Sequence, residues 1–190
     1  MIDTHAHIYD EAFDEDREAM MARAKAQGIE KILMPNVDLN TLPKMLAVEA
    51  RYPAQCHSML GLHPCYVDEQ VEETLAEMAQ SLDQHPFIAI GEIGMDLFHD
   101  QRFEEEQKHA FRIQIEWAKQ RNLPIVIHTR KSMSQTLKIL KEAQDGSLTG
   151  VFHCFVTHAQ DAKDIIDLGF HLGIGGVSTF KNSKLQNVYS

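Results

Sequence analysis

The chain has 190 residues, a hydrophobic fraction of 44%, a charged fraction of 24% and a formal net charge of −10. This length supports one domain with a substantial core, and the composition is that of an ordinary globular protein. The acidity argues against broad binding of nucleic acid through its phosphates, because that mode needs a basic face. We expect neither a membrane span nor a secretory leader, because the sequence contains no apolar window of the required kind.

The cysteines indicate a reducing environment. Cys56, Cys65 and Cys154 are scattered, and no CxxC pair occurs. A sparse, odd number of cysteines is typical of proteins whose thiols stay free. We therefore expect a cytoplasmic protein.

The chain opens with a short extended run from Ile2 that ends in His5-Ala6-His7. In a strand, side chains two positions apart point the same way, so two imidazoles at this spacing can hold one metal ion. An isolated His-x-His is more often a surface pair. The motif gains weight because four later apolar runs also end in a polar or metal-binding residue.

Helical patterns and apolar runs alternate along the rest of the chain. The first helix is expected at residues 14–27, capped by Asp14 and stopped by Gly28. Further helices are expected at residues 40–51, 71–82, 103–121, 133–140 and 162–169. Strands are expected at residues 29–34, 59–62, 87–90, 124–127, 150–152 and 170–174, after the first one.

Seven strands that alternate with helices and are apolar throughout predict a parallel sheet with right-handed crossovers. A doubly wound open sheet and a closed barrel both fit this pattern. The barrel is favoured, because no GxGxxG opens the first helix and polar residues recur at the C-terminal ends of many strands. We therefore predict that residues 1–190 form a single α/β domain of the TIM-type (β/α) barrel class.

The number of strands leaves this predicted barrel incomplete. Such barrels usually have eight strands and about 250 residues. We therefore expect the chain to lack the last strand and helix, with residues 183–189 resembling the start of another helix. The two explanations that remain open are a piece of a longer chain and a barrel completed by another chain.

The residues at the strand ends suggest metal chemistry. They are His5, His7, Glu92, His128 and His153. Imidazoles and carboxylates are ligands for divalent Zn, Mn, Co or Ni, and a carboxylate can bridge two ions. Each residue alone is commoner as a hydrogen-bonded core or loop residue. In a barrel all five converge on one mouth, which favours a two-metal site that activates a water and neutralises substrate oxygens.

Six motifs occur in order along the chain: Asp3-Thr4-His5-Ala6-His7, Gly61-Leu62-His63-Pro64, Gly91-Glu92-Ile93-Gly94-Met95-Asp96, His128-Thr129-Arg130, His153-Cys154-Phe155 and Gly176-Val177-Ser178-Thr179-Phe180-Lys181. With these motifs the chain resembles the TatD family of metal-dependent deoxyribonucleases, which are amidohydrolase-like barrel hydrolases. The resemblance covers essentially the whole chain. It implies a 3′-to-5′ exonuclease or phosphodiesterase that acts on DNA through two divalent ions, which could be Zn, Mg, Mn, Co or Ni.

The resemblance also implies a role for each site residue. His5 and His7 would hold one metal ion, His128 and His153 would hold the second, and the catalytic Glu92 would bridge the two. His63 and Arg130 stand where the family places substrate or phosphate contacts. Lys181 is a further candidate contact, with a solvated lysine as the equal alternative.

One family motif is missing from the chain. The family's last strand ends in Thr-Asp-x-Pro, whose Asp is a metal ligand, and no such motif follows Lys181. We therefore expect this chain to bind metal weakly and to hydrolyse DNA poorly or not at all. Two other interpretations remain: a barrel amidohydrolase or lactonase, which typically has a bridging Lys where Glu92 stands, and a non-catalytic relic. No membrane and no obligate protein partner is expected.

Overall fold

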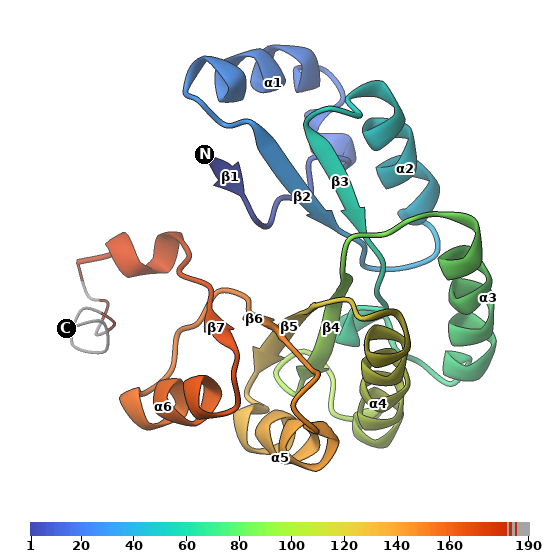
Figure 1. The fold of residues 1–190 in the computed structure, drawn as a ribbon, viewed down its shortest axis with the longest axis vertical. Coiled ribbons are helices and arrows are strands. Elements are labelled where there is room, and N and C mark those ends of the chain that lie inside the picture. Colours follow the sequence, from blue (N-terminus) through green and yellow to red (C-terminus); the bar gives the residue numbers. More distant parts are fainter. Residues whose placement is uncertain (182, 184, 186–190) are drawn as a thin grey trace.

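The computed structural model describes residues 1–181, 183 and 185, which fold into parallel strands alternating with helices (Figure 1). The strands are β1 (Ile2–Asp3), β2 (Lys31–Pro35), β3 (Cys56–Met59), β4 (Ile90–Asp96), β5 (Ile125–Arg130), β6 (Gly150–Phe152) and β7 (His171–Leu172). The α-helices are α1 (Arg17–Ala26), α2 (Leu42–Arg51), α3 (Val71–Gln84), α4 (Glu104–Arg121), α5 (Met133–Ala143) and α6 (Ala159–Asp167). Short 3-10 helices are η1 (Glu11–Phe13), η2 (Pro64–Tyr66) and η3 (Gly176–Thr179).

The strands pair with their neighbours in chain order. β1, β2 and β3 form one sheet and β4 to β7 form a second, with every pair parallel. Figure 1 shows the strands along the inner side of a curve, with the helices outside them. The predicted seven-stranded α/β architecture is confirmed, and no strand pairing joins β7 to β1 within the described residues. No described helix is long and apolar enough to cross a lipid bilayer.

A seam of close backbone contacts joins the two sheets. Leu60 forms an isolated parallel bridge with Ile90, and the Gly91 N–H donates to the Leu60 carbonyl at 2.8 Å. A Cβ on Gly61 would lie 2.7 Å from the Gly91 carbonyl carbon, and one on Gly91 would lie 2.6 Å from Val126 Cβ. Gly61 therefore lets the two sheets approach each other, and Gly91 lets β4 approach β5 within the second sheet, at the points where two of the site motifs begin.

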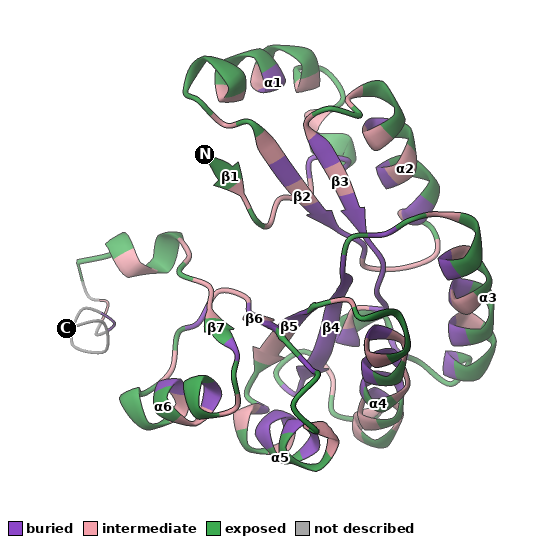
Figure 2. Cartoon of the chain, viewed as in Figure 1, coloured by how far each residue is buried: buried purple, intermediate pink, exposed green. Residues whose placement is uncertain are grey.

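The core lies between the strands and the helices that cover them. Buried residues concentrate on the strands and on the helix faces that point toward them (Figure 2). The helix predicted at residues 71–82 is confirmed as α3, which buries Val71, Leu75, Met78 and Leu82 along one stripe. Burial of such a stripe supplies most of the stability of an amphipathic helix.

The start of the first helix differs from the prediction. α1 begins at Arg17 rather than at residue 14, because residues 11–13 form η1, which the Asp10 side chain caps by accepting from the Ala12 N–H. Asp14 therefore does not cap α1, and its carboxylate instead pairs with Arg17 at 2.6 Å.

Two strands are displaced along the sequence from their predicted positions. β3 ends at Met59, and residues 60–62 leave its ladder to approach β4. β4 begins at Ile90 and includes the whole glycine-containing motif through Asp96, all of it buried. Pairing with β5, from Ile90 opposite Ile125 to Asp96 opposite Arg130, overrides the low strand propensity of Gly91 and Gly94. The predicted helix start at residues 183–189 falls largely outside the described residues.

Candidate metal centre

A buried carboxylate in β4 forms the middle of the candidate site. The Glu92 side chain is 4% exposed, and its Oε2 atom lies 3.1 Å from His5 Nε2 and 3.5 Å from His7 Nε2. The two Nε2 atoms are 3.2 Å apart. Tetrahedral Zn²⁺ with Zn–N and Zn–O distances of about 2.0–2.2 Å has ligand-to-ligand edges of about 3.3–3.5 Å. The three atoms therefore already have the spacing of ligands around one cation.

The other oxygen of Glu92 faces a second set of imidazoles. Oε1 lies 3.1 Å from His128 Nδ1, 3.6 Å from His63 Nε2 and 4.0 Å from His153 Nε2. The carboxylate thus stands between two groups of nitrogen donors, one on each oxygen. This is the arrangement that a bridging ligand of two ions requires.

His5 and His7 reach Glu92 from a loop and not from a strand. β1 contains only Ile2 and Asp3, but the Ala6 N–H donates to the Leu33 carbonyl at 3.1 Å. This bond keeps the chain extended beside β2, so both imidazoles turn the same way, as the His-x-His spacing predicts.

The hydrogen bonds of Tyr9 assign the tautomer of His7. The Tyr9 hydroxyl donates to the Pro35 carbonyl at 2.6 Å, so at its 2.9 Å contact with His7 Nδ1 it must accept. Neutral His7 therefore has its proton on Nδ1 and directs the Nε2 lone pair at the Glu92 carboxylate. A lone pair that faces an anion needs a cation between them, which fits a metal ion.

His128 is oriented in the same way by Asp96. Asp96 is fully buried, and its Oδ2 atom lies 3.0 Å from His128 Nε2. A carboxylate accepts, so Nε2 carries the proton and Nδ1 is directed at Glu92 as a ligand. Burial lowers the pKa of His128, but Glu92 and Asp96 raise it above its usual value. When His128 is protonated, its Nδ1 can donate to Glu92 Oε1 at 3.1 Å.

His63 differs from His7 and His128 because its other nitrogen accepts. His63 Nδ1 accepts from the Cys65 N–H at 3.1 Å, so the ring proton of the neutral form lies on Nε2. Burial lowers the pKa of His63, which favours that neutral form. His63 thus presents an N–H donor to the centre. This property suits a substrate contact better than a metal ligand, although His63, Glu92 and His128 lie close enough together to hold an ion.

Glu92 stays ionised in these surroundings. Burial alone would raise the pKa of its carboxyl, but the imidazoles of His128, His5, His63 and His7 hold it far below the usual range. His153 stays neutral, because burial and the neighbouring His5 lower its pKa to about 4. The His5 and His153 rings stack with centroids 3.5 Å apart.

The structure brings together six of the eight residues singled out from the sequence. His5, His7, His63, His128 and His153 each place a nitrogen within 4.0 Å of a Glu92 oxygen. Arg130 lies outside this group of histidines. Its Nη1 is 3.4 Å from His99 Nε2, and its guanidinium lies 3.9 Å above the Phe98 ring. Lys181 is exposed beyond η3, and no described hydrogen bond or ion pair connects it to Glu92.

Sequence reasoning missed the groups that position these side chains. Asp96 and Tyr9 orient two of the imidazoles, as described above. Two buried glutamines of α4 hold the backbone: Gln107 makes two hydrogen bonds with the main chain of Asp96, and Gln114 makes two with that of Leu62. The two glutamines could have been found from their spacing, because they lie on the same helix stripe as the buried residues Phe111, Ile115 and Ala118.

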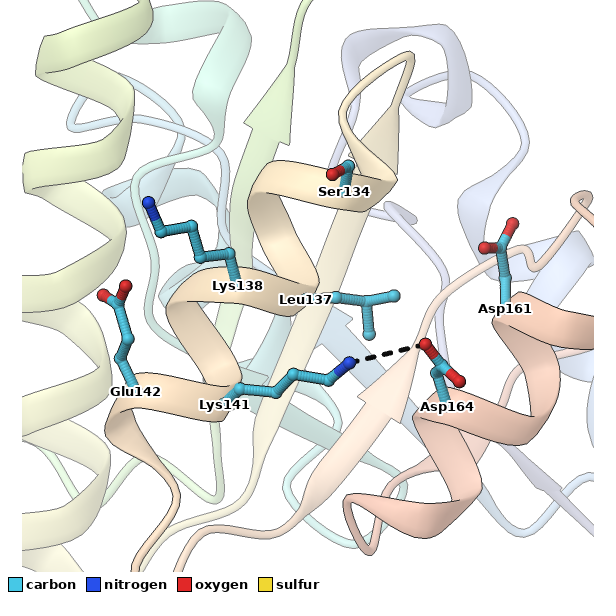
Figure 3. A pocket seen from close by; sticks show the side chains of 7 residues that line it. All are labelled: Ser134, Leu137, Lys138, Lys141, Glu142, Asp161 and Asp164. Atoms are coloured by element: carbon cyan, nitrogen blue, oxygen red, sulfur yellow. Dashed lines mark hydrogen bonds and ion pairs between the residues drawn. The ribbon is translucent and has the colours of Figure 1, made fainter.

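A surface pocket lies away from this centre. It has a volume of about 490 Å³ and lies between α5 and α6, where Lys141 Nζ is 3.4 Å from Asp164 Oδ2 (Figure 3). Its lining contains lysines and carboxylates but no histidine or cysteine. The Glu92 centre, by contrast, gathers five histidines around one buried carboxylate.

Comparison with known proteins identifies relatives along nearly the whole chain. The family model described as TatD related DNase matches residues 2–189. An uncharacterized metal-dependent hydrolase, YabD of Bacillus subtilis, is 36% identical over 184 residues, which cover 97% of this chain and 72% of YabD. The 3′-5′ ssDNA/RNA exonuclease TatD of Cronobacter turicensis is 32% identical over 176 residues, which cover 93% of this chain and 66% of that relative.

Solved structures agree with this result. The crystal structure of YJJV, a TatD homolog from Escherichia coli K12, superimposes with a TM-score of 0.91 at 32% identity, covering 99% of this chain and 73% of that one. A TatD family hydrolase from Entamoeba histolytica shows the same fold, with a TM-score of 0.80 at 24% identity, covering 99% of this chain and 68% of that one.

Proposed function

The chain belongs to the TatD family of metal-dependent hydrolases, and we propose that its Glu92 centre hydrolyses phosphodiester bonds of DNA from the 3′ end. The observation that carries the proposal is the division of imidazoles between the two oxygens of one buried carboxylate. The exonuclease name of the Cronobacter turicensis relative supports a nucleic-acid substrate.

The donor atoms of the centre suit two divalent ions. We assign His5 and His7, with Glu92 Oε2, to one ion, and His128 and His153, with Glu92 Oε1, to the other. When bound, such ions supply Lewis acidity toward phosphate oxygens and activate a water. They also reconcile DNA binding with a net charge of −10, because the positive charge is local.

The remaining groups of the centre bind and orient the substrate. His63 offers its Nε2 proton to a non-bridging phosphate oxygen, and Arg130 neutralises a phosphate on the same side. Phe98, which is 54% exposed beneath the Arg130 guanidinium, offers a surface on which a nucleotide base can stack. Asp96 and Tyr9 keep His128 and His7 in the tautomers that direct their lone pairs inward.

The test is hydrolysis of single-stranded DNA by the purified chain and by Glu92→Gln, at high protein concentration because a slow rate is expected without the Thr-Asp-x-Pro motif. This substitution keeps the size of the side chain and removes its charge, and we expect the rate to fall by at least ~100-fold, as when transition-state charge stabilisation is lost. Glu73→Gln on the exposed face of α3 is the matched control and should leave the rate unchanged. Labels at each end, and a strand with a blocked 3′ terminus, report the direction of digestion.

Two results would contradict the proposal. One is a Glu92→Gln rate within twofold of the unaltered chain. The other is hydrolysis of cyclic amides or lactones in a parallel screen without any cleavage of DNA or of a phosphodiester reporter.

A further inference from the structure

A second cluster of possible metal ligands lies beside the Glu92 centre. Cys65 Sγ is 3.5 Å from Asp96 Oδ2 and 3.5 Å from His99 Nδ1, and these two atoms are 2.9 Å apart. The three residues come from η2, from the end of β4 and from the loop after it. The activity proposed above gives Cys65 and His99 no role.

The three distances match the edges of a zinc site. With Zn–S of about 2.3 Å, Zn–N of about 2.0–2.1 Å and Zn–O of about 2.0–2.2 Å, tetrahedral geometry places S···N and S···O edges near 3.5 Å and the N···O edge near 3.3–3.4 Å. Both sulfur edges already have this length. Only the edge between His99 and Asp96 has to open by a few tenths of an ångström, and the His99 side chain can move because it is 51% exposed.

We propose that Cys65, Asp96 and His99 form a third divalent-cation site, selective for zinc-type ions and separate from the two ions of the Glu92 centre. The thiolate provides the selectivity, because sulfur favours Zn²⁺ or Co²⁺ over Mg²⁺ or Mn²⁺. The Glu92 centre offers only nitrogen and oxygen donors, so the two sites differ in the ions that they accept.

The middle ligand of the third site is held rigidly. Asp96 Oδ1 accepts from the backbone N–H groups of Phe98 and His99 at 2.9 and 3.0 Å. Gln107 holds the Asp96 backbone through both of its polar groups. The remaining oxygen, Oδ2, therefore points at Cys65 and His99 before any ion arrives.

The other side of the site is open to solvent. Cys65 and His99 line a surface cavity of about 340 Å³ together with Asp68 and Asp100. Cys65 is exposed, so an ion can enter from this cavity, and water can supply a fourth ligand. The two additional carboxylates favour a cation at this position, although Asp100 is paired with Arg102.

Without an ion, hydrogen bonds alone account for the cluster. Burial and Asp96 raise the pKa of Cys65 to about 12, so the thiol keeps its proton and donates it to Asp96. A bound divalent ion would replace that proton with its own charge. The alternative is therefore a neutral hydrogen-bonded network, which a metal titration can distinguish from a cation site.

The third site is connected to the Glu92 centre through shared atoms. Asp96 Oδ2 also accepts from His128 Nε2, so an ion bound to this oxygen would be linked through Asp96 to His128, a proposed ligand of the Glu92 centre. His99 Nε2 now lies 3.4 Å from Arg130 Nη1. With an ion on Nδ1, the Nε2 atom would carry the ring proton and no longer accept from Arg130, which frees that guanidinium for a phosphate.

The test is cobalt binding followed by absorption spectroscopy. A cysteine ligand produces a sulfur-to-cobalt charge-transfer band in the near ultraviolet, which nitrogen and oxygen ligands do not. We expect the band in the unaltered chain, its loss in Cys65→Ser and its retention in the control Cys154→Ser. Glu92→Gln should keep the band, so failure of this proposal can be told apart from failure of the proposed hydrolysis.

His99→Asn provides a second variant that does not depend on tolerance of a change at Cys65. It should weaken cobalt binding at the band by at least ~10-fold, and zinc analysis should show one equivalent fewer for Cys65→Ser than for the unaltered chain. The proposal is overturned if the unaltered chain shows no such band, if the band survives Cys65→Ser, or if it is lost in Cys154→Ser instead.

Discussion

Replacement of Gln114 by leucine should destabilise the fold although Gln114 lies in none of the proposed ligand sets. The Gln114 side chain is 1% exposed. Its Oε1 accepts from the Leu62 N–H at 2.7 Å, and its Nε2 donates to the carbonyls of Leu62 and Ala110 at 3.3 and 3.2 Å. Leu62 directly precedes His63, so this helix side chain holds the backbone from which His63 reaches Glu92.

The magnitude follows from the groups left behind. Leucine fills a similar volume but offers no polar atom, so the N–H and the carbonyl of buried Leu62 both lose a partner. Each such group costs ~1–3 kcal/mol. Burial of the more apolar leucine side chain offsets ~1–2 kcal/mol of this loss. We therefore expect the free energy of unfolding to fall by roughly 1–4 kcal/mol, a large part of the stability of a typical domain.

Urea unfolding followed by circular dichroism measures this loss. Gln120→Leu is the matched control, because Gln120 lies on the same helix but is exposed. The control should change the free energy of unfolding by no more than ~0.5 kcal/mol. If the two variants were equally stable, the hydrogen bonds between Gln114 and Leu62 would not contribute as argued.

Three further predictions concern the same region. Gln107→Leu should lower the free energy of unfolding by a similar ~1–4 kcal/mol. It should also weaken zinc binding by ~10–100-fold in a chelator competition assay, because Asp96 would no longer hold His128, and unchanged zinc binding would contradict this role. Zinc at 100-fold above its Kd should stabilise the chain by ~2.7 kcal/mol for each occupied site in thermal unfolding, and EDTA should reverse the effect. An unfolding temperature that changes with neither zinc nor EDTA would argue against metal binding. In the metal-free chain, the pKa of His153 should be about 4 by NMR titration, below the usual 6.5. His153 of the unfolded chain binds a proton more readily than buried His153 does, so protonation favours unfolding. The free energy of unfolding should therefore fall as the pH is lowered from 6.5 toward 4. A measured pKa near 6.5 would refute the effect of burial.

The convergence of the five strand-end residues could be predicted from the sequence. Parallel strands place their carboxyl ends along one edge, so apolar runs followed by histidine or glutamate must bring these side chains together. The structure agrees, because each of the four strand-end histidines, His5, His7, His128 and His153, has a nitrogen within 4.0 Å of a Glu92 oxygen. The family resemblance was also correct, since the comparisons place the chain in that family.

The roles of individual nitrogens could not be predicted in this way. Whether a histidine offers a lone pair or a proton depends on the partner of its other nitrogen. For His7 and His128 this partner is Tyr9 or Asp96, and for His63 it is the Cys65 N–H. His128 and Asp96 are 32 positions apart, and a contact of that range leaves no periodic trace in the sequence.

The ends of β3 and β4 were predicted wrongly for a related reason. Hydrophobicity favoured residues 59–62 and 87–90 as strands, whereas backbone pairing with β2 and β5 selects Cys56–Met59 and Ile90–Asp96. The β4 segment contains two glycines, a glutamate and an aspartate, which single-residue propensities assign to a loop. Neighbouring strands satisfy its backbone, and the site itself accounts for its buried carboxylates.

The glycine seam between the two sheets limits how this protein can change over evolutionary time. Gly61 lies two positions before His63, and Gly91 directly precedes Glu92, so the contact that joins the sheets also sets the spacing of two site residues. A larger residue at Gly61 would push the two sheets apart, and one at Gly91 would push β4 away from β5, so either change would disturb the site. Substitutions that alter substrate preference therefore have to accumulate elsewhere, at exposed positions around the mouth such as Tyr66 and Phe98. New specificities can arise at these positions, whereas the seam has almost no freedom to vary.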